Sequence, residues 1–266
     1  MAIIKVKPGD KINLRNIDPG DTGKYDDKKT AQKLLADQIE RMAALQNALY
    51  AEDKQSLLIV LQALDAGGKD GTIRRVLSGV NPQGVKVTSF KSPTEEELSH
   101  DFLWRVHKAV PPQGMIGVFN RSHYEDVLIV RVHEWVPKSV WQARFDHINN
   151  FEKLLTDNNV RILKFYLHIS KDEQKERFQE RLDIPEKRWK FNPADLEERS
   201  YWNDYWDAFE DVFEKCSPKS APWYIVSANR KWYRNLVIAE TIVEALEDMD
   251  PKYPKPAEGL DDIVID

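Results

Sequence analysis

The chain has 266 residues, with 39 Lys and Arg against 44 Asp and Glu, so its formal net charge is −5. A hydrophobic fraction of 41% argues against disorder, and the length suits one domain spanning residues 1–266. The single cysteine, Cys216, excludes a disulfide framework, and no apolar run is long enough to span a membrane. We therefore expect a cytoplasmic protein with no membrane partner, and the acidic total argues against nucleic acid as a partner.

The first half of the chain begins with an arm and then alternates between helix and strand. Residues 1–27 contain turn signals without a sustained hydrophobic period, so we expect an extended N-terminal arm. Apolar residues at helical spacing predict a helix over 28–50, and the continuous apolar run at 56–64 predicts a strand buried on both faces. A helix over 69–78 and a strand over 85–90 are expected next.

The second half continues the alternation and ends in an acidic tail at 248–266. The predicted elements are a helix at 94–110, a strand at 115–120, a helix starting near 122, a helix at 138–155, a strand at 160–169, a helix at 171–182, a helix at 193–213, a strand at 223–226 and a helix at 230–246. Strands that alternate with helices predict an α/β fold of three layers, with a parallel sheet of about five strands between two layers of helices.

A glycine-rich segment, ALDAGGKDGT from Ala63 to Thr72, lies between the first predicted strand and its helix. The phosphate-loop pattern G-x-x-x-x-G-K-[ST] is met at Gly68 and Lys69, but it fails at Ala63 and Asp70. Small residues at a helix N-terminus let backbone N–H groups surround an anion, so the segment predicts phosphate binding. A plain strand-to-helix turn with a solvated lysine is the alternative. The candidate phosphate ligands are Ala66, Gly67, Gly68, Lys69, Asp70, Gly71 and Thr72.

Asp65 precedes this loop directly. A carboxylate among phosphates is unfavourable unless a cation lies between them, so Asp65 indicates either a Mg²⁺ site or a proton-accepting role.

The third predicted strand ends in Phe119-Asn-Arg-Ser-His-Tyr-Glu-Asp126. Because ligands of doubly wound folds gather at the carboxyl ends of strands, this segment and the phosphate loop should face one crevice. The Arg121 guanidinium suits phosphate oxygens. An ion pair from Arg121 to Glu125 or Asp126 is the alternative interpretation.

Basic residues cluster between the fourth predicted strand and Pro193, and Pro185 interrupts the helix there. A solvated helix face with i,i+4 ion pairs would explain part of this pattern. In P-loop kinases, however, this position holds a lid that closes over the transferring phosphates. We therefore predict a lid over residues 171–195. The basic residues of the cluster are Arg177, Arg181, Lys187, Arg188 and Lys190.

Together these segments resemble polyphosphate kinase family 2, a branch of the P-loop kinases. The similarity covers roughly residues 30–247. It rests on Leu64-Asp-Ala-Gly-Gly-Lys-Asp-Gly-Thr72, on Phe119 to Asp126, on Arg181-Leu-Asp-Ile-Pro-Glu-Lys-Arg-Trp-Lys190 with Asn192-Pro-Ala-Asp195, and on Ala221-Pro-Trp-Tyr with Asn229-Arg-Lys-Trp. The resemblance implies a P-loop kinase fold with a helical lid, and an enzyme that moves the terminal phosphate between inorganic polyphosphate and a nucleotide.

The resemblance also implies roles for individual residues. Asp65, Lys69 and Arg121 would be catalytic, and Arg181, Lys187, Arg188 and Lys190 would bind polyphosphate from the lid. Asp65 would hold Mg²⁺, for which Mn²⁺ is a substitute, and Glu125 and Asp126 are further candidate ligands. Many members carry Asp where this chain has Asn120, and Asn there is typical of the subgroup that accepts both AMP and ADP. The nucleotide-binding candidates are Asn120, Arg121, Tyr124, Glu125 and Asp126.

Two other functions stay open: an ATP-dependent nucleoside monophosphate kinase and a non-catalytic module that binds phosphate ligands. A homo-oligomer is also expected, although core packing would explain the eight Trp equally well. Residues 240–266 contain nine acidic residues and two lysines, so residues 1–239 carry a net charge of +2. The acidic total therefore leaves room for a polyanion in one cationic channel.

Overall fold

The computed structural model describes residues 3–258 and 265. The described residues form a six-stranded sheet in the spatial order β1-β6-β5-β2-β4-β3. Neighbouring strands run parallel, except that β1 runs antiparallel to β6. The strands are β1 (Ile3–Lys5), β2 (Ser56–Gln62), β3 (Val85–Ser89), β4 (Ile116–Asn120), β5 (Val160–His168) and β6 (Trp223–Ser227).

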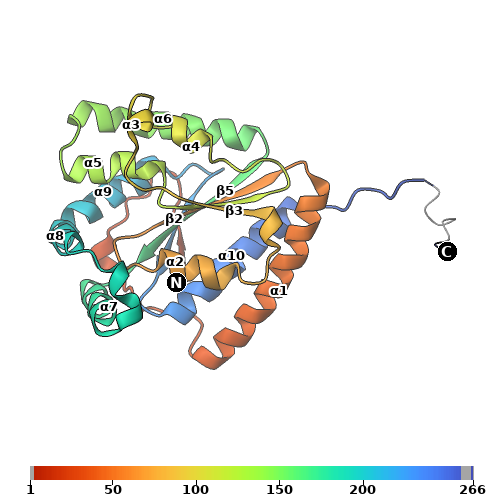
Figure 1. Ribbon diagram of the computed structural model, residues 1–266, viewed down its shortest axis with the longest axis horizontal. Helices are drawn as coiled ribbons and strands as arrows, with labels where there is room; N and C mark the ends of the chain where they lie inside the picture. Colours follow the sequence, from red (N-terminus) through yellow and green to blue (C-terminus); the bar gives the residue numbers. More distant parts are fainter. Residues whose placement is uncertain (1–2, 259–264, 266) are drawn as a thin grey trace.

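Helices cover both faces of the sheet, which confirms the expected three-layer α/β fold (Figure 1). In Figure 1, α1, α2 and α10 lie on one face, α3, α4 and α6 lie on the other, and α7 and α8 lie at one end. The α-helices are α1 (Lys28–Glu52), α2 (Lys69–Val76), α3 (Glu95–Leu98), α4 (Trp104–His107), α5 (Ile129–Val132), α6 (Lys138–Asp157), α7 (Lys171–Asp183), α8 (Ala194–Glu198), α9 (Trp202–Lys215) and α10 (Lys231–Met249). Short 3₁₀ helices are η1 (Leu14–Asn16), η2 (Pro82–Gly84), η3 (His123–Val127), η4 (Pro185–Lys190) and η5 (Arg199–Tyr201).

The core is centred on β2 and β5, which are adjacent in the sheet. Every residue of β2 is buried, as its continuous apolar sequence SLLIVLQ predicts for a strand covered on both faces. The strand β5 is buried at every position but Arg161. This rigid centre fixes where the segments after β2 and β4 begin, and those segments carry the predicted phosphate loop and Arg121.

The N-terminal arm adds a strand that the sequence did not reveal. Residues 3–5 pair with β6 through Ile4 opposite Ile225, so the sheet has a sixth strand beyond the expected five. A three-residue strand is too short to show a hydrophobic period. The rest of the arm is held against the domain, with Leu14 fully buried and the Ser227 hydroxyl donating to the Asp18 carbonyl. The arm is therefore part of the fold.

Two predicted helices are shorter than expected. The helix predicted at 94–110 is broken into α3 and α4, because the Asp101 carboxylate accepts from the Leu103 backbone N–H and starts a new turn. The helix predicted near 122 is the 3₁₀ helix η3, where Ser122 Oγ accepts from the Tyr124 backbone N–H. Local side-chain hydrogen bonds compete with the helical pattern at both places.

The helix predicted at 193–213 is also divided, into α8 and α9 with the 3₁₀ turn η5 between them. The interruption at Pro185 occurs as expected, since α7 ends at Asp183 and η4 starts at Pro185. Within residues 3–258, no helix combines the length and apolar character that a membrane crossing requires. Residues 259–264 and 266 of the predicted acidic tail lie outside the described residues, as do residues 1–2 of the arm.

Candidate active site

The phosphate loop joins β2 to α2 in a conformation that requires its small residues. Gly68 has φ 106° and Ala66 has φ 57°, both in the left-handed region. A Cβ on Gly67 would lie 2.4 Å from the Ala63 Cβ, so the chain is too tight there for any side chain. Lys69 Nζ donates to the Ala63 carbonyl at 2.9 Å, which holds the ammonium within the loop.

Helix α7 braces the loop from outside. Arg177 Nη1 donates to the carbonyls of Ala66 and Gly67, each at 2.9 Å, and its Nη2 donates to the Ala228 carbonyl at 2.7 Å. The Gln174 amide donates to the Asp65 carbonyl at 2.9 Å. These bonds turn loop carbonyls outward toward α7, and they join the loop to the helix that begins the predicted lid.

Asp65 and Arg121 form an ion pair across two neighbouring parallel strands. Arg121 Nη2 lies 2.8 Å from Asp65 Oδ1, and Arg121 itself has φ 60°. Burial disfavours the charge on Arg121, but the carboxylates of Glu125 and Asp65 outweigh it and raise the Arg121 pKa. The predicted convergence of the two strand ends is thus observed.

A second contact links the same two segments. Asn120 Nδ2 donates to Asp70 Oδ1 at 2.6 Å, so the end of β4 bonds to the first turn of α2. An Asp at position 120 would place two carboxylates in contact, whereas the amide of Asn120 supplies a donor.

A large cavity of about 700 Å³ opens over the phosphate loop. Ten of its lining residues are Lys or Arg and four are Asp or Glu, so the cavity is strongly cationic although the chain as a whole is acidic. Burial and the Arg121 charge lower the pKa of Lys69 to about 8. The charged residues that line this basic cavity are Asp65, Lys69, Asp70, Arg74, Lys91, Arg121, Arg177, Glu180, Arg181, Lys187, Lys190, Asp195, Lys231 and Arg234.

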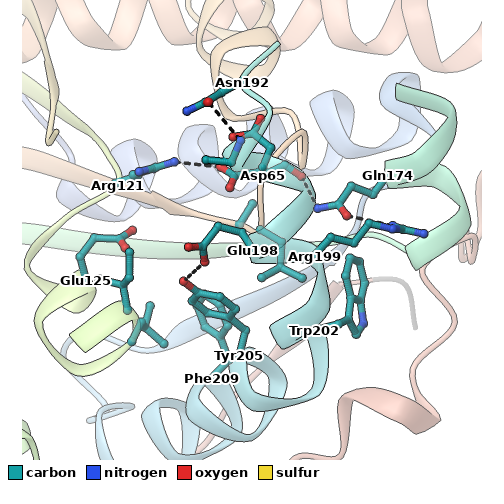
Figure 2. A pocket seen from close by; sticks show the side chains of 16 residues that line it. Asp65, Arg121, Glu125, Gln174, Asn192, Glu198, Arg199, Trp202, Tyr205 and Phe209 are labelled. Carbon is teal, nitrogen blue, oxygen red and sulfur yellow. Dashed lines mark hydrogen bonds and ion pairs between the residues drawn. The ribbon is translucent and has the colours of Figure 1, made fainter. Parts of the chain in front are cut away.

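A smaller cavity of about 240 Å³ adjoins the basic cavity and shares Asp65, Arg121, Asn192 and Asp195 with it. Figure 2 shows Asp65 and Arg121 at one end of this aromatic cavity, with Tyr205 and Phe209 at the other. Its charged and aromatic lining residues are Asp65, Arg121, Glu125, Asp195, Glu198, Arg199, Trp202, Tyr205 and Phe209. The ion pair of Asp65 and Arg121 therefore stands where two chemically different spaces meet.

The predicted lid segment contributes side chains to both cavities. Arg181 Nη1 donates to Asp195 Oδ2 at 3.2 Å, and this hydrogen bond joins α7 to the first turn of α8. Glu180 pairs with Lys187 of η4 and, at 3.5 Å, with Lys231 of α10. Arg181, Lys187 and Lys190 thus line the basic cavity, as expected of phosphate ligands in a lid.

Four sequence-predicted site residues do not line either cavity. Arg188 donates to the Leu182 carbonyl at 2.8 Å and stays outside, whereas Thr72 is buried with its hydroxyl donating to the Gly68 carbonyl at 3.1 Å. Tyr124 is fully buried in the core, which corrects its prediction as a nucleotide ligand.

Asp126 is the fourth of these residues. It accepts from Arg144 Nη1 at 3.2 Å and lines neither cavity, so the structure does not bring it together with the other predicted metal or nucleotide ligands. Burial raises its pKa to about 6, although Arg144 opposes the shift.

The burial of Tyr124 has a structural cause. Its hydroxyl contacts a fully buried ion pair in which Lys164 Nζ lies 2.5 Å from Glu152 Oε2. Glu152 Oε1 also contacts His123 Nε2 at 3.2 Å. Burial opposes the charge on Glu152, but Lys164 and then His123 outweigh it and lower the Glu152 pKa. This network fixes η3, and with it the backbone that carries Arg121 and Glu125.

Among the described residues, no three or more His, Cys, Asp or Glu side chains are arranged to hold a metal ion. Glu125 lines the aromatic cavity, and burial raises its pKa, partly offset by Arg121 and Lys69. Burial and then the Asp65 charge raise the pKa of Asp195. One or two carboxylates beside a phosphate site are the usual protein contribution to Mg²⁺, because the substrate phosphates supply further oxygen ligands. The donor set around Asp65 fits that case.

Sequence reasoning missed several lining residues because they come from distant segments. Lys231 and Arg234 lie on α10, and Arg74 lies one turn into α2. The aromatic residues of α9 show a helical period that is equally typical of a core-facing helix. In the sequence, the position of the site was indicated by the motifs at the carboxyl ends of strands. Those motifs do not indicate which helix faces reach the site.

A mostly parallel sheet, a glycine-rich loop at a helix N-terminus and a cationic cavity over that loop define a P-loop kinase fold. The family model described as Polyphosphate kinase 2 (PPK2) matches residues 24–254. The chain belongs to this family of polyphosphate:nucleotide phosphotransferases.

Individual relatives are similar over nearly their whole length. The chain is 52% identical to the AMP/ADP-polyphosphate phosphotransferase of Meiothermus ruber over 100% of both chains. It is 48% identical to the ADP-polyphosphate phosphotransferase of Rhodopseudomonas palustris, over 94% of this chain and 91% of that protein. The crystal structure of Polyphosphate Kinase 2 from Arthrobacter aurescens TC1 has a TM-score of 0.93 and 45% identity, covering 97% of this chain and 93% of that chain.

Proposed function

We propose that this enzyme moves the terminal phosphate between inorganic polyphosphate and AMP or ADP. The observation that carries the proposal is the meeting of the basic cavity and the aromatic cavity at the Asp65–Arg121 pair. A phosphotransferase needs a donor space and an acceptor space that share one point, because the phosphoryl group passes directly between them. The relatives named above support polyphosphate as donor and AMP or ADP as acceptor.

Polyphosphate binds in the basic cavity. A chain of phosphates carries about one negative charge per unit. The ten cationic side chains that line this cavity of about 700 Å³ attract that charge. Lys69 and the N-terminus of α2 receive the terminal phosphate, since that is where loop N–H groups and the helix dipole converge.

The acceptor nucleoside binds in the aromatic cavity. Trp202, Tyr205 and Phe209 give this cavity an aromatic lining that suits a base, and the Glu198 carboxylate can accept hydrogen bonds from ribose hydroxyls. Its phosphates extend toward Arg121 at the shared end. In this arrangement Arg121 and Glu125 bind the nucleotide. Asn120 lies beside them and lines the basic cavity.

The transfer needs little proton movement. An acceptor phosphate oxygen is already ionised, so it forms a bond to the terminal phosphorus while the bond to the bridging oxygen breaks, leaving polyphosphate one unit shorter. Lys69 and Arg121 then hold the charge that builds on the phosphoryl oxygens, and their positions are fixed before the reaction. Asp65 would hold Mg²⁺, with Glu125 of the same cavity as a second carboxylate, and the ion would offset phosphate charge when bound.

Asn120 supports the use of both acceptors. Its amide bonds to Asp70 and lines the basic cavity as a neutral group, which tolerates acceptor phosphates of different charge better than a carboxylate would.

The experiment is a donor exchange. The purified enzyme is supplied with AMP or ADP and with either polyphosphate alone or ATP alone, and the nucleotides are separated by chromatography. Phosphorylation with polyphosphate and none with ATP supports the proposal. Phosphorylation of AMP only with ATP would indicate a nucleoside monophosphate kinase, and a polyphosphate-induced rise in melting temperature without turnover would indicate a non-catalytic binding module.

A further inference from the structure

Arg234, on α10, is a buried cation without an anionic partner. Its side chain is 3% exposed, and its Nε and Nη2 donate only to the neutral amide oxygen of Asn235, at 3.1 and 2.9 Å. Within the described part of the chain, Nη1 has no hydrogen-bond acceptor. A buried charge is costly unless it is paired, and at neutral pH a guanidinium stays protonated, so Arg234 bears that cost.

Its neighbours add to that cost. The guanidinium of Arg177 lies close to it, and Glu173, the carboxylate that favours the Arg234 charge, accepts from Arg177 at 2.7 Å. Burial and the Arg177 charge lower the pKa of Arg234 to about 9. The sequence places an unfavourable charge here, which is typical of functional sites rather than of structural ones.

The Arg234 guanidinium lies against the phosphate loop and faces the basic cavity. A Cβ built on Gly68 would lie 2.0 Å from Arg234 Nη1, and one built on Gly71 would lie 3.6 Å from Nη2. The guanidinium therefore lies against the first turn of α2 and lines the basic cavity beside Lys69. Only glycine at position 68 leaves room for it.

We propose that Arg234 is a polyphosphate-binding residue that completes the donor site from α10. This inference rests on the proposed function and assigns one residue within it. The anionic oxygens of a bound phosphate supply the partner that Nη1 lacks, so the cost of burying Arg234 is recovered only when donor is present. Because the contact is to the donor, its loss weakens polyphosphate binding and leaves the acceptor site unchanged.

The test compares Arg234→Met with Arg230→Met. Arg230 is an exposed residue one turn earlier, does not line either cavity, and its replacement removes the same charge. Polyphosphate binding is measured by calorimetry without nucleotide, KM values are measured for polyphosphate and for AMP, and melting temperatures are measured without ligand. Arg234→Gln, which retains a donor for Asn235, replaces Arg234→Met if the latter does not fold.

The expected result has three parts. Arg234→Met binds polyphosphate at least about tenfold more weakly than Arg230→Met, its KM for AMP changes less than twofold, and its melting temperature without ligand is no lower than that of the wild type. A loss of polyphosphate affinity below threefold, or a lowered melting temperature with unchanged affinity, overturns the proposal and assigns Arg234 a structural role. If the wild type itself does not bind polyphosphate, the proposed function and this inference both fail.

Discussion

At the scale of single residues, Asp65 and Lys69 hold the centre of the site for different reasons. Asp65 Oδ1 is bonded to Arg121, and Oδ2 has no protein partner among the described residues. Lys69 is held by the Ala63 carbonyl while four neighbouring charges act on it: Arg121 lowers its pKa, and Asp65, Glu125 and Asp70 raise it. Asp65 therefore has a carboxylate oxygen available to bind a cation. The protonation of the Lys69 amine depends on the charges of the groups bound beside it.

Replacing Asp65 by Asn should lower turnover by at least about 100-fold, the size of effect seen when one preorganised electrostatic group is removed. Asn keeps the shape but removes the charge that would hold Mg²⁺, so any remaining activity should depend weakly on Mg²⁺. Turnover is measured across a Mg²⁺ titration. Glu186→Gln, an exposed carboxylate of η4 outside both cavities, is the control. Near-normal turnover in Asp65→Asn would rule out this role.

Polyphosphate affinity should fall as pH rises above about 8. The pKa of Lys69 is lowered to about 8, so its amine loses the proton above that pH, whereas bound phosphates favour the charged form. The KM for polyphosphate should therefore be nearly constant below pH 8 and rise by about tenfold per pH unit above it.

The matched control for this pH dependence is Lys69→Arg. Its guanidinium stays protonated over the whole range, so the variant should lack the rise in KM that starts near pH 8, even if its activity is lower. A wild-type profile that stays flat from pH 7 to 10 would contradict the assignment of Lys69.

At the scale of elements, β5 and α6 fix the position of η3 through the buried network of Lys164, Glu152 and Tyr124. Arg121 and Glu125 belong to the segment that this network fixes, so its integrity determines the shape of the shared end of the two cavities. Breaking one partner leaves the other charge buried and unpaired.

Lys164→Met should destabilise the protein by about 3–5 kcal/mol, because it strands the buried Glu152 carboxylate. The corresponding fall in melting temperature is roughly 6–20 °C. The double variant Glu152→Leu/Lys164→Met should recover most of that loss, since no charge then remains buried. Thermal unfolding of the three proteins measures both effects. A single variant as stable as the wild type would contradict the pairing.

In the predicted lid segment, Glu180 pairs with Lys187 and Lys231, so we expect it to compete with phosphate for both lysines. Glu180→Gln should release both lysines toward the basic cavity and lower the KM for polyphosphate by roughly two- to fivefold at low salt, the range expected for exposed ion pairs. The gain should vanish at high salt. Glu176→Gln removes the same charge one turn earlier on α7 and should leave KM unchanged. A raised KM in Glu180→Gln would contradict this competition.

The elements that sequence predicted best are those with one dominant signal. The strand β2 is a continuous apolar run, and the phosphate loop combines glycines with Lys69 between a strand and a helix. The break between α3 and α4 was not predicted, because it depends on one hydrogen bond, which the Leu103 backbone N–H donates to the Asp101 carboxylate. The role of Arg234 was not predicted, because it depends on the contact with Gly68, which is far away in the sequence. No local sequence pattern indicates that contact.

At the scale of the whole molecule, charge is separated in space. The chain carries a net charge of −5, yet the basic cavity gathers ten cationic residues from α2, α7, η4 and α10 and from the segments that follow β3 and β4. Parallel strands make this possible, because their carboxyl ends bring the loop of one strand and the end of its neighbour to the same edge. The expected homo-oligomer stays a prediction. Exposed Trp135 and Trp189, 62% and 78% exposed, are two surface residues by which its interface can be sought.

The central claim is that one phosphoryl group passes directly from polyphosphate to a nucleotide. Phosphorus NMR of a single reaction with AMP, Mg²⁺ and polyphosphate, and without ATP, follows both substrates at once. We predict that phosphate lost from polyphosphate appears in equal amount as the β-phosphate of ADP and then the γ-phosphate of ATP. Release of free inorganic phosphate without nucleotide phosphorylation, or no change until ATP is added, would contradict the account.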